Sequence, residues 1–242
     1  MALKVHSYES LGTYDGPGIR LVVFLQGCPF RCLYCANPDT IAYEGGTETG
    51  TEEIIDRALR EKSFFGKRGG VTFSGGEPTV QAKDLIPVVR GLKDNGINVC
   101  IDTNGGVWNK DVEELMSIND LALLDVKECN PERHRHITGR DNTRTLETAE
   151  WLEDHQKPFW LRYVLVPGLS DFEEDIRAMG EHFKGYRMIE RVELLPYHTL
   201  GKHKYESLGW EYKLEGVPLN TPGQLAKARS VLEEYFGCVI QN

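Results

Sequence analysis

The stretch Gln26-Gly27-Cys28-Pro29-Phe30-Arg31-Cys32-Leu33-Tyr34-Cys35 places three thiols in a CxxxCxxC spacing, directly after the apolar run at residues 19–25. Thiolates are the soft ligands that iron–sulfur clusters prefer. Cys28, Cys32 and Cys35 can hold three irons of a [4Fe–4S] cube, and the fourth iron is left open to a small chelating molecule. The spacing alone also allows a zinc site, a disulfide with one thiol over, or buried thiols. A structural zinc, however, needs a fourth ligand, and no Cys or His stands close by in the sequence.

Bulk composition limits the classes of function. The chain has 242 residues, 40% hydrophobic and 27% charged, so we predict one domain over residues 1–242. A net charge of −9 argues against binding to nucleic acid or to anionic membranes. No apolar run approaches the roughly 20 residues of a membrane helix, and the first residues lack a signal-peptide core. Six cysteines, three of them in one motif, favour a reducing compartment, so we expect a cytoplasmic protein.

Hydrophobic periodicity predicts alternating strands and helices. Strands are expected at residues 3–8, 19–25, 71–73, 97–102, 121–126, 159–166 and 192–195. Helices are expected from residue 51, at 81–95, 110–117 and 143–155, from residue 171 and from residue 221. This alternation implies a parallel sheet with right-handed crossovers. Six strand–helix units are fewer than the eight of a closed barrel, so the pattern predicts an α/β fold, an incomplete barrel open along one side.

Local signals predict where several segments begin. Thr51 is a candidate N-cap, and Asp171 with Glu174 three residues on is an Asp version of a capping box. Thr221 followed by Pro222 opens the last helix. Residues 196–220 are expected to form a long loop, and loops of that length are often functional.

Six further motifs, the first of which is a DGPG turn, occur in a fixed order. They are Asp15-Gly16-Pro17-Gly18-Ile19-Arg20, Ser74-Gly75-Gly76-Glu77-Pro78, Asp102-Thr103-Asn104-Gly105, Leu124-Asp125-Val126-Lys127, Arg162-Tyr163-Val164-Leu165-Val166-Pro167-Gly168 and Leu194-Leu195-Pro196-Tyr197-His198. With CxxxCxxC and its aromatic Tyr34, this set resembles the pyruvate formate-lyase activating enzymes of the radical S-adenosylmethionine (SAM) superfamily. The resemblance runs from about His6 to the last helix and implies a splayed, partial (β/α)6 barrel of the TIM type.

The resemblance implies an activity. The three cysteines would ligate the [4Fe–4S] cluster, and the amino and carboxylate groups of SAM would chelate its open iron. Reductive cleavage of SAM would then give a 5′-deoxyadenosyl radical that removes a hydrogen from the Cα of one glycine of pyruvate formate-lyase. The family also implies a flavodoxin or ferredoxin as electron donor, and we expect a monomer.

The resemblance assigns the SAM site to residues from several motifs. They are Tyr34, Cys35, Ala36, Gly75, Gly76, Glu77, Asp125, Val126, Lys127 and His198. Close relatives can carry His at the position of Ala36, so only a backbone contact is expected there. The other readings are an ordinary βα turn at Gly75–Glu77, simple packing for Tyr34 and a surface position for His198.

Two further sets of residues follow from the resemblance. Asp102 and Asp125 match a monovalent-cation site for K⁺ or Na⁺, since hard oxygen ligands suit such an ion. The alternative is that these two side chains cap the turns that follow them. Asp15 and Arg162 would lie near the bound glycine loop of the substrate, and the alternative for Arg162 is a buried pair with a carboxylate. The cysteines outside the motif, residues 100, 129 and 238, are read as packing or free thiols.

Other functions remain open from the sequence. The chain could activate a different glycyl radical enzyme, or it could be a radical SAM enzyme that acts on a small molecule. Activases of other glycyl radical enzymes often carry an extra ferredoxin-like module, and the absence of Cys between Cys35 and Gly75 favours the pyruvate formate-lyase type. A zinc-binding or electron-transfer protein without catalysis is the alternative from a different class.

Overall fold

The computed structural model describes residues 2–241, which form two compact units. The first unit holds the chain up to Pro29 together with Thr40–Leu123, and the second holds Phe30–Asp39 together with the chain from Leu124 onward. Both units alternate strands with helices, so the predicted α/β class is confirmed. The single domain expected for residues 1–242 stays a prediction.

The first unit is a sheet in the order β3-β1-β2-β4-β5-β6. Its strands are β1 (Ala2–Gly12), β2 (Arg20–Leu25), β3 (Thr47–Gly50), β4 (Gly70–Gly75), β5 (Asn98–Thr103) and β6 (Leu121–Asp125), the last of which is divided between the units. Strand β1 runs antiparallel to β2 and to β3, whereas β2, β4 and β5 are parallel. The predicted parallel arrangement therefore begins at β2.

The strand register gathers polar side chains on one face of this sheet. Thr72 in β4 lies between Val22 in β2 and Cys100 in β5. Because successive residues of a strand point to opposite faces, Ser74 and Asp102 share the face of Thr72 and Cys100. The Ser74 hydroxyl donates to the Asp102 carboxylate at 2.6 Å. Phe73 and Ile101, which alternate with these residues along β4 and β5, are apolar and buried, so the two faces of the sheet differ in chemistry.

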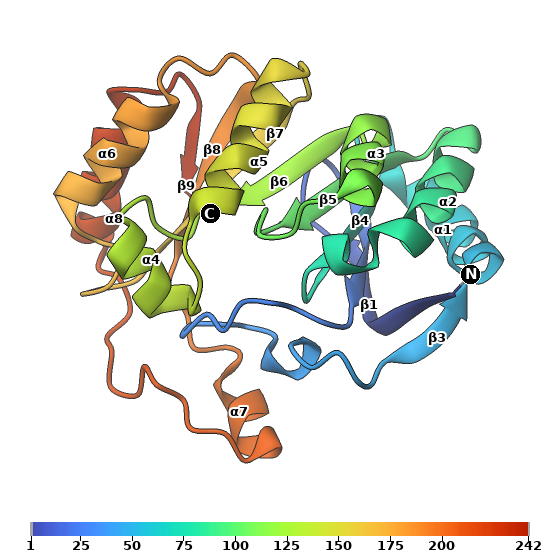
Figure 1. Ribbon diagram of the computed structural model, residues 1–242, viewed down its shortest axis with the longest axis horizontal. Coiled ribbons are helices and arrows are strands. Elements are labelled where there is room, and N and C mark those ends of the chain that lie inside the picture. The colour runs from blue at the N-terminus through green and yellow to red at the C-terminus, as the bar shows by residue number, and fades with distance from the viewer. Residues whose placement is uncertain (1, 242) are drawn as a thin grey trace. The chain divides into compact units, whose positions relative to one another are not determined.

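Three helices accompany the sheet of the first unit. They are α1 (Thr51–Phe65), α2 (Ala82–Asp94) and α3 (Lys110–Ile118), which lie side by side in Figure 1. Each supplies an apolar stripe whose central residues, Ile54, Leu85 and Leu115, are completely buried. Two short 3-10 turns, η1 (Pro38–Thr40) and η2 (Pro78–Gln81), complete the connections.

The second unit contains the parallel strands β7 (Phe159–Leu165), β8 (Ile189–Pro196) and β9 (Val239–Gln241). Its helices are α4 (Pro131–Thr138), α5 (Thr143–Asp154), α6 (Glu173–Phe183), α7 (Lys202–Leu208) and α8 (Pro222–Glu233). Helices α6 and α8 lie side by side (Figure 1). An aromatic core of this unit joins Tyr34, Tyr197, Tyr205 and Tyr212 to buried aliphatic side chains.

Two predicted helix starts differ from the structure. Helix α1 has Gly50 as its N-cap with no side-chain hydrogen bond, so the prediction of Thr51 as the cap was wrong. Helix α6 is capped by Phe172, because the Asp171 carboxylate instead accepts a hydrogen bond from the Gly168 N–H at 2.7 Å. Asp171 therefore serves as the acceptor for a backbone N–H of the preceding turn, and it does not cap helix α6.

The predicted start of the last helix is confirmed. The Thr221 hydroxyl accepts from the Gln224 N–H at 3.2 Å, and the Gln224 side chain accepts from the Thr221 N–H at 2.8 Å. This reciprocal pair satisfies two backbone donors at the helix terminus. Pro222 occupies the first turn, as expected.

Four short elements were missed by the sequence reasoning, namely β3, α4, α7 and β9. Helix α4 carried a usable signal: the Asn130 side chain accepts from two backbone N–H groups, Pro131 follows, and Gly139 ends the helix in the left-handed conformation. Its polar composition concealed the hydrophobic period. Within residues 2–241, no helix combines the length and apolar character needed to cross a bilayer.

Candidate cluster and cofactor site

Cys28 is the cysteine of the CxxxCxxC motif that lies in the first unit, and hydrogen bonds hold it in place. Its side chain is buried, and its N–H donates to the Ile41 carbonyl at 3.1 Å. The amide nitrogen of Asn104 lies 3.7 Å from the Cys28 sulfur and donates toward it. Cys28 therefore sits in a defined polar environment at the carboxyl end of β2.

Cys32 and Cys35 belong to the second unit, where helix α4 holds their loop. The Arg31 and Leu33 N–H groups donate to the Thr138 and Ile137 carbonyls at 2.8 and 2.9 Å. These carbonyls are among the last of α4, which have no partner within the helix. The helix terminus and the cysteine loop thus satisfy each other's backbone groups.

Burial favours the protonated form of both thiols of this loop in the metal-free chain. Burial raises the pKa of Cys32 to about 12, and the nearby charge of Lys127 only partly opposes it. Burial also raises the pKa of Cys35. Metal ligation requires thiolates, so binding of a cluster would release these protons.

The donor set fits an iron–sulfur cluster. Within residues 2–241, no group of three or more His, Cys, Asp or Glu side chains is arranged to hold a metal ion. In a [4Fe–4S] cube each thiolate ligates its own iron, so the thiols of the motif have the chemistry that such a cluster needs. The sulfur chemistry and the hydrogen bond to Cys28 are those of a cluster ligand.

The Gly75-Gly76-Glu77 turn packs against the loop that leads to Cys28. The Gly76 and Glu77 N–H groups donate to the Leu25 and Gly27 carbonyls, each at 2.8 Å. A Cβ on Gly76 would lie only 2.3 Å from the Gly27 carbonyl oxygen. Within this unit, Gly76 is therefore required by the close approach of two backbone segments.

The Glu77 carboxylate ties this turn to the Asp102–Gly105 turn. One oxygen accepts from the Thr79 N–H and from the hydroxyls of Thr79 and Thr103, and the other accepts from the Asn104 N–H at 2.7 Å. Burial raises the pKa of Glu77, and the four donors oppose that rise by favouring the ionised form. Both oxygens of the carboxylate are thus used to hold the two turns together, a role that the sequence analysis did not predict.

Three of the predicted SAM-site residues come together in the second unit. The Lys127 ammonium lies 2.5 Å from the Asp125 carboxylate and 5.8 Å from the centre of the Tyr34 ring. Burial alone would lower the pKa of Lys127, but the paired Asp125 more than offsets this and raises it well above its usual value. Within residues 2–241, the buried Tyr34 hydroxyl has no hydrogen-bond partner. Asp125 is thus paired with a cation, whereas Asp102, in the first unit, accepts from Ser74.

Arg162 is part of a buried ion pair. Its Nε lies 3.4 Å from the Glu193 carboxylate, whose other oxygen lies 3.3 Å from Arg191. The Arg162 carbonyl accepts from the Val126 N–H at 3.0 Å, which fixes the segment after β6. The structure thus contains the Arg162–carboxylate pair that the sequence left open as an alternative.

Asp15 is held through its backbone. The Thr72 hydroxyl donates to the Asp15 carbonyl at 2.6 Å and accepts from the Nε of Arg20 at 2.6 Å. Arg20 is completely buried, and it also donates to the Pro17 carbonyl at 2.9 Å. This network folds the DGPG turn onto the polar face of the sheet, and no sequence pattern indicated the role of Arg20.

Helix α7 holds the segment that follows Cys35. The Tyr205 hydroxyl donates to the Cys35 carbonyl at 3.3 Å, and Lys204 lies 3.1 Å from the Asp39 carboxylate. Ala36 packs closely against Gly201 through its backbone. His198, which precedes this helix, is exposed, and its Nδ1 accepts from the Leu200 N–H at 3.4 Å.

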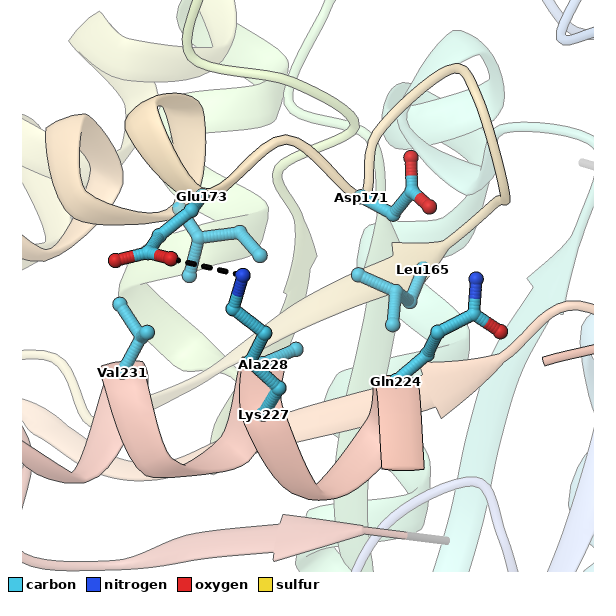
Figure 2. Close-up of a pocket in the computed structure, with 8 residues that line it drawn as sticks. Leu165, Asp171, Glu173, Gln224, Lys227, Ala228 and Val231 are labelled. Atoms are coloured by element: carbon cyan, nitrogen blue, oxygen red, sulfur yellow. Dashed lines mark ion pairs between the residues drawn. The ribbon is translucent and has the colours of Figure 1, made fainter. Parts of the chain in front are cut away.

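A separate pocket lies between α6 and α8 and contains none of the predicted site residues. Leu165, Ile176, Ala228 and Val231 provide its apolar lining, and Asp171, Glu173, Gln224 and Lys227 provide polar groups. Figure 2 shows the Lys227 ammonium pointing to the Glu173 carboxylate, 3.0 Å away. The Lys227 and Glu173 side chains of this pocket are thus paired with each other, and the Asp171 carboxylate accepts from the Gly168 N–H.

The sequence matches the model of the radical SAM superfamily over residues 22–179. A structure of Streptococcus suis SuiB bound to precursor peptide SuiA has a TM-score of 0.71 over 91% of this chain and 48% of that chain, at 14% identity. A domain of a pyruvate-formate lyase-activating enzyme from Bacteroides vulgatus has a TM-score of 0.61 over 72% of this chain and 99% of that chain, at 23% identity. The chain is a member of the radical SAM superfamily with its partial (β/α)6 barrel fold, as predicted.

Relatives of known name are similar over nearly the whole chain. The pyruvate formate-lyase-activating enzyme of Streptococcus mutans is 45% identical over 96% of this chain and 93% of its own length. The pyruvate formate-lyase 1-activating enzyme of Escherichia coli is 43% identical over 96% of both chains. Within the superfamily, this chain belongs to the pyruvate formate-lyase activating enzymes.

Proposed function

We propose that this chain activates pyruvate formate-lyase by generating a glycyl radical on it. The observation that carries the proposal is the 40–45% identity to activating enzymes over nearly the whole chain, together with the intact CxxxCxxC motif. Membership of the superfamily implies SAM and an iron–sulfur cluster. When bound, the cluster supplies the electron for reductive cleavage of SAM, whose 5′-deoxyadenosyl radical removes a hydrogen from one glycine of the partner.

The chain's own residues would bind and orient these groups. Cys28, Cys32 and Cys35 would ligate three irons. Tyr34 and Lys127 would line the SAM site, with Asp125 holding the ammonium of Lys127 in place. The other residues proposed for this site are Cys35, Ala36, Gly75, Gly76, Glu77, Val126 and His198. For Glu77 the support is indirect, since its carboxylate anchors the turn that carries the glycines.

Substrate and partner assignments complete the proposal. Asp15 and Arg162 would lie near the glycine loop of pyruvate formate-lyase, with Arg162 oriented by Glu193. A flavodoxin or ferredoxin would deliver the electron, and the protein would act as a cytoplasmic monomer with one radical SAM domain, residues 1–242. Asp102 and Asp125 would contribute carboxylate oxygens to a K⁺ or Na⁺ site.

The direct test is anaerobic reconstitution of the protein with iron and sulfide, followed by addition of reductant, SAM and pyruvate formate-lyase. We expect a glycyl radical signal in electron paramagnetic resonance (EPR) and stoichiometric 5′-deoxyadenosine. The variant Cys28→Ser should lose both products. The matched control is Cys238→Ser, which changes an exposed cysteine outside the motif and should keep both products. SAM cleavage without a radical on pyruvate formate-lyase would reject this substrate, and a colourless zinc-containing protein would reject the activity.

A further inference from the structure

Asn104 is placed to act on the proposed cluster through Cys28. It directly follows β5 in the Asp102–Gly105 turn and is 7% exposed. Its Nδ2 lies 3.7 Å from the Cys28 sulfur, which is the distance of an N–H···S hydrogen bond. Both residues belong to the first unit, so this contact is internal to one compact body.

The orientation of the Asn104 amide is fixed by its other contacts. Its Oδ1 accepts from the Gly106 N–H at 2.8 Å, which leaves Nδ2 as the atom that faces the sulfur. Its backbone N–H donates to Glu77 at 2.7 Å, and Glu77 is in turn held by Thr79 and Thr103. The donor is therefore preorganised toward Cys28.

We propose that Asn104 raises the reduction potential of the cluster by donating a hydrogen bond to the Cys28 thiolate. This inference rests on the proposed function, in which Cys28 ligates the cluster. Reduction adds negative charge to the cluster and its sulfur ligands, so a donor stabilises the reduced form more than the oxidised form. The buried setting strengthens the effect because water does not screen it.

A change in the cluster potential affects two electron transfers, one from the electron donor to the cluster and one from the cluster to SAM. A higher potential makes the cluster easier for the electron donor to reduce, and it makes the reduced cluster a weaker reductant of SAM. Asn104 thus sets a balance between these two steps. It acts as a positioning and tuning residue, since it contacts the ligand and not the substrate.

The test measures the cluster potential in the reconstituted protein without SAM, by redox titration followed with EPR. In Asn104→Ala we expect the equilibrium constant for one-electron reduction to fall about tenfold, a shift of about 59 mV to lower potential. Asn104→Asp keeps an acceptor for the Gly106 N–H but has no amide donor, so its potential should also fall. The matched control is Asn142→Ala, another buried Asn (5% exposed) whose amide donates to the Cys129 carbonyl, and its potential should be unchanged.

A spectroscopic readout separates tuning from a merely structural role. After exchange into D₂O, pulsed EPR of the reduced wild-type cluster should show coupling to an exchangeable deuteron that both Asn104 variants lack and Asn142→Ala retains. An unchanged potential and an unchanged deuteron coupling in either Asn104 variant would overturn the inference. If Asn104→Ala assembles no cluster, Asn104→Asp supplies the measurement. If neither variant assembles one, pulsed EPR of wild-type protein carrying ¹⁵N-labelled Asn decides it: a coupling of the reduced cluster to ¹⁵N supports the inference, and its absence overturns it. Failure of the proposed function looks different, because Cys28→Ser would then keep the same cluster as the wild type.

Discussion

At the scale of single residues, two buried carboxyl groups differ in the number of hydrogen bonds that they accept. Glu77 accepts four hydrogen bonds, enough to hold a buried carboxylate. Glu128, which follows Lys127, accepts two from the Cys129 and Asn130 N–H groups on one oxygen. Its other oxygen lies 3.2 Å from the Tyr163 hydroxyl, which has a single hydrogen for this oxygen and for the Ser170 carbonyl at 2.8 Å. A proton on Glu128 would donate to the Tyr163 oxygen and leave the Tyr163 hydrogen for the Ser170 carbonyl.

Glu128→Gln should therefore preserve the network. Burial raises the pKa of Glu128, and the hydrogen bonds from the Asn130 and Cys129 N–H groups only partly oppose this rise. The folded chain binds this proton more tightly than the unfolded chain, so the stability it contributes is full below the ordinary pKa of 4.5 and is lost as pH rises through the folded value. We expect Glu128→Gln to unfold at about 1 kcal/mol higher free energy than wild type at pH 8. The difference should shrink at pH 5.

Denaturant unfolding of the metal-free protein at the two pH values measures this effect. Glu128→Ala is the control, since it leaves the Cys129 and Asn130 N–H groups without their acceptor and should be less stable than wild type at both pH values. A Glu128→Gln protein that is less stable than wild type at pH 8 would show that Glu128 is ionised in the fold.

At the scale of elements, turns at strand ends do most of the positioning. The Gly75–Glu77 turn packs on the loop before Cys28, and the end of α4 packs on the loop around Cys32. Both contacts are backbone to backbone, so they depend on close approach and not on particular side-chain chemistry. That explains why a glycine stands at the tightest point, residue 76.

Gly76→Ala tests this close approach. The new Cβ would lie 2.3 Å from the Gly27 carbonyl oxygen and 2.9 Å from that of Thr40, so backbone must move. We expect the unfolding free energy of the metal-free protein to fall by about 1–3 kcal/mol. Gly185→Ala is the matched control, because a Cβ there meets nothing within 4 Å. Equal stability of the two variants would contradict the packing role.

At the scale of the whole molecule, ligand binding should be coupled to folding. A ligand that binds only the folded state stabilises it, by about 2.7 kcal/mol at a hundredfold excess over its dissociation constant. We expect SAM to raise the unfolding temperature of the cluster-loaded protein in a concentration-dependent way. The metal-free protein and Cys28→Ser should show a much smaller shift, because the proposed chelating iron is missing from them. Equal shifts in all three, measured by anaerobic thermal unfolding, would place SAM binding away from the cluster.

Much of this molecule could be predicted from its sequence. Periodicity located strand β2, the strands from β4 to β8 and the helices α1, α2, α3, α5 and α6, because buried strands and amphipathic helices carry strong local patterns. Short elements such as β3 and α7 escaped, since a few residues carry no clear period. The helix start at Thr221 could be predicted because its capping partner, Gln224, is three residues away in the chain. Asp171 does not cap helix α6, because its carboxylate accepts from the Gly168 N–H of a turn.

The sequence by itself determined the family, the cysteine motif and the strand–helix order, because those depend on residue identity and spacing along the chain. Only the tertiary structure decided that Glu77 anchors two turns, that Arg162 pairs with Glu193, and that Asn104 faces the Cys28 sulfur. These contacts join residues 27 to 76 positions apart in the sequence. No local pattern specifies such pairs, since the partner of a buried polar group is set by strand register and burial.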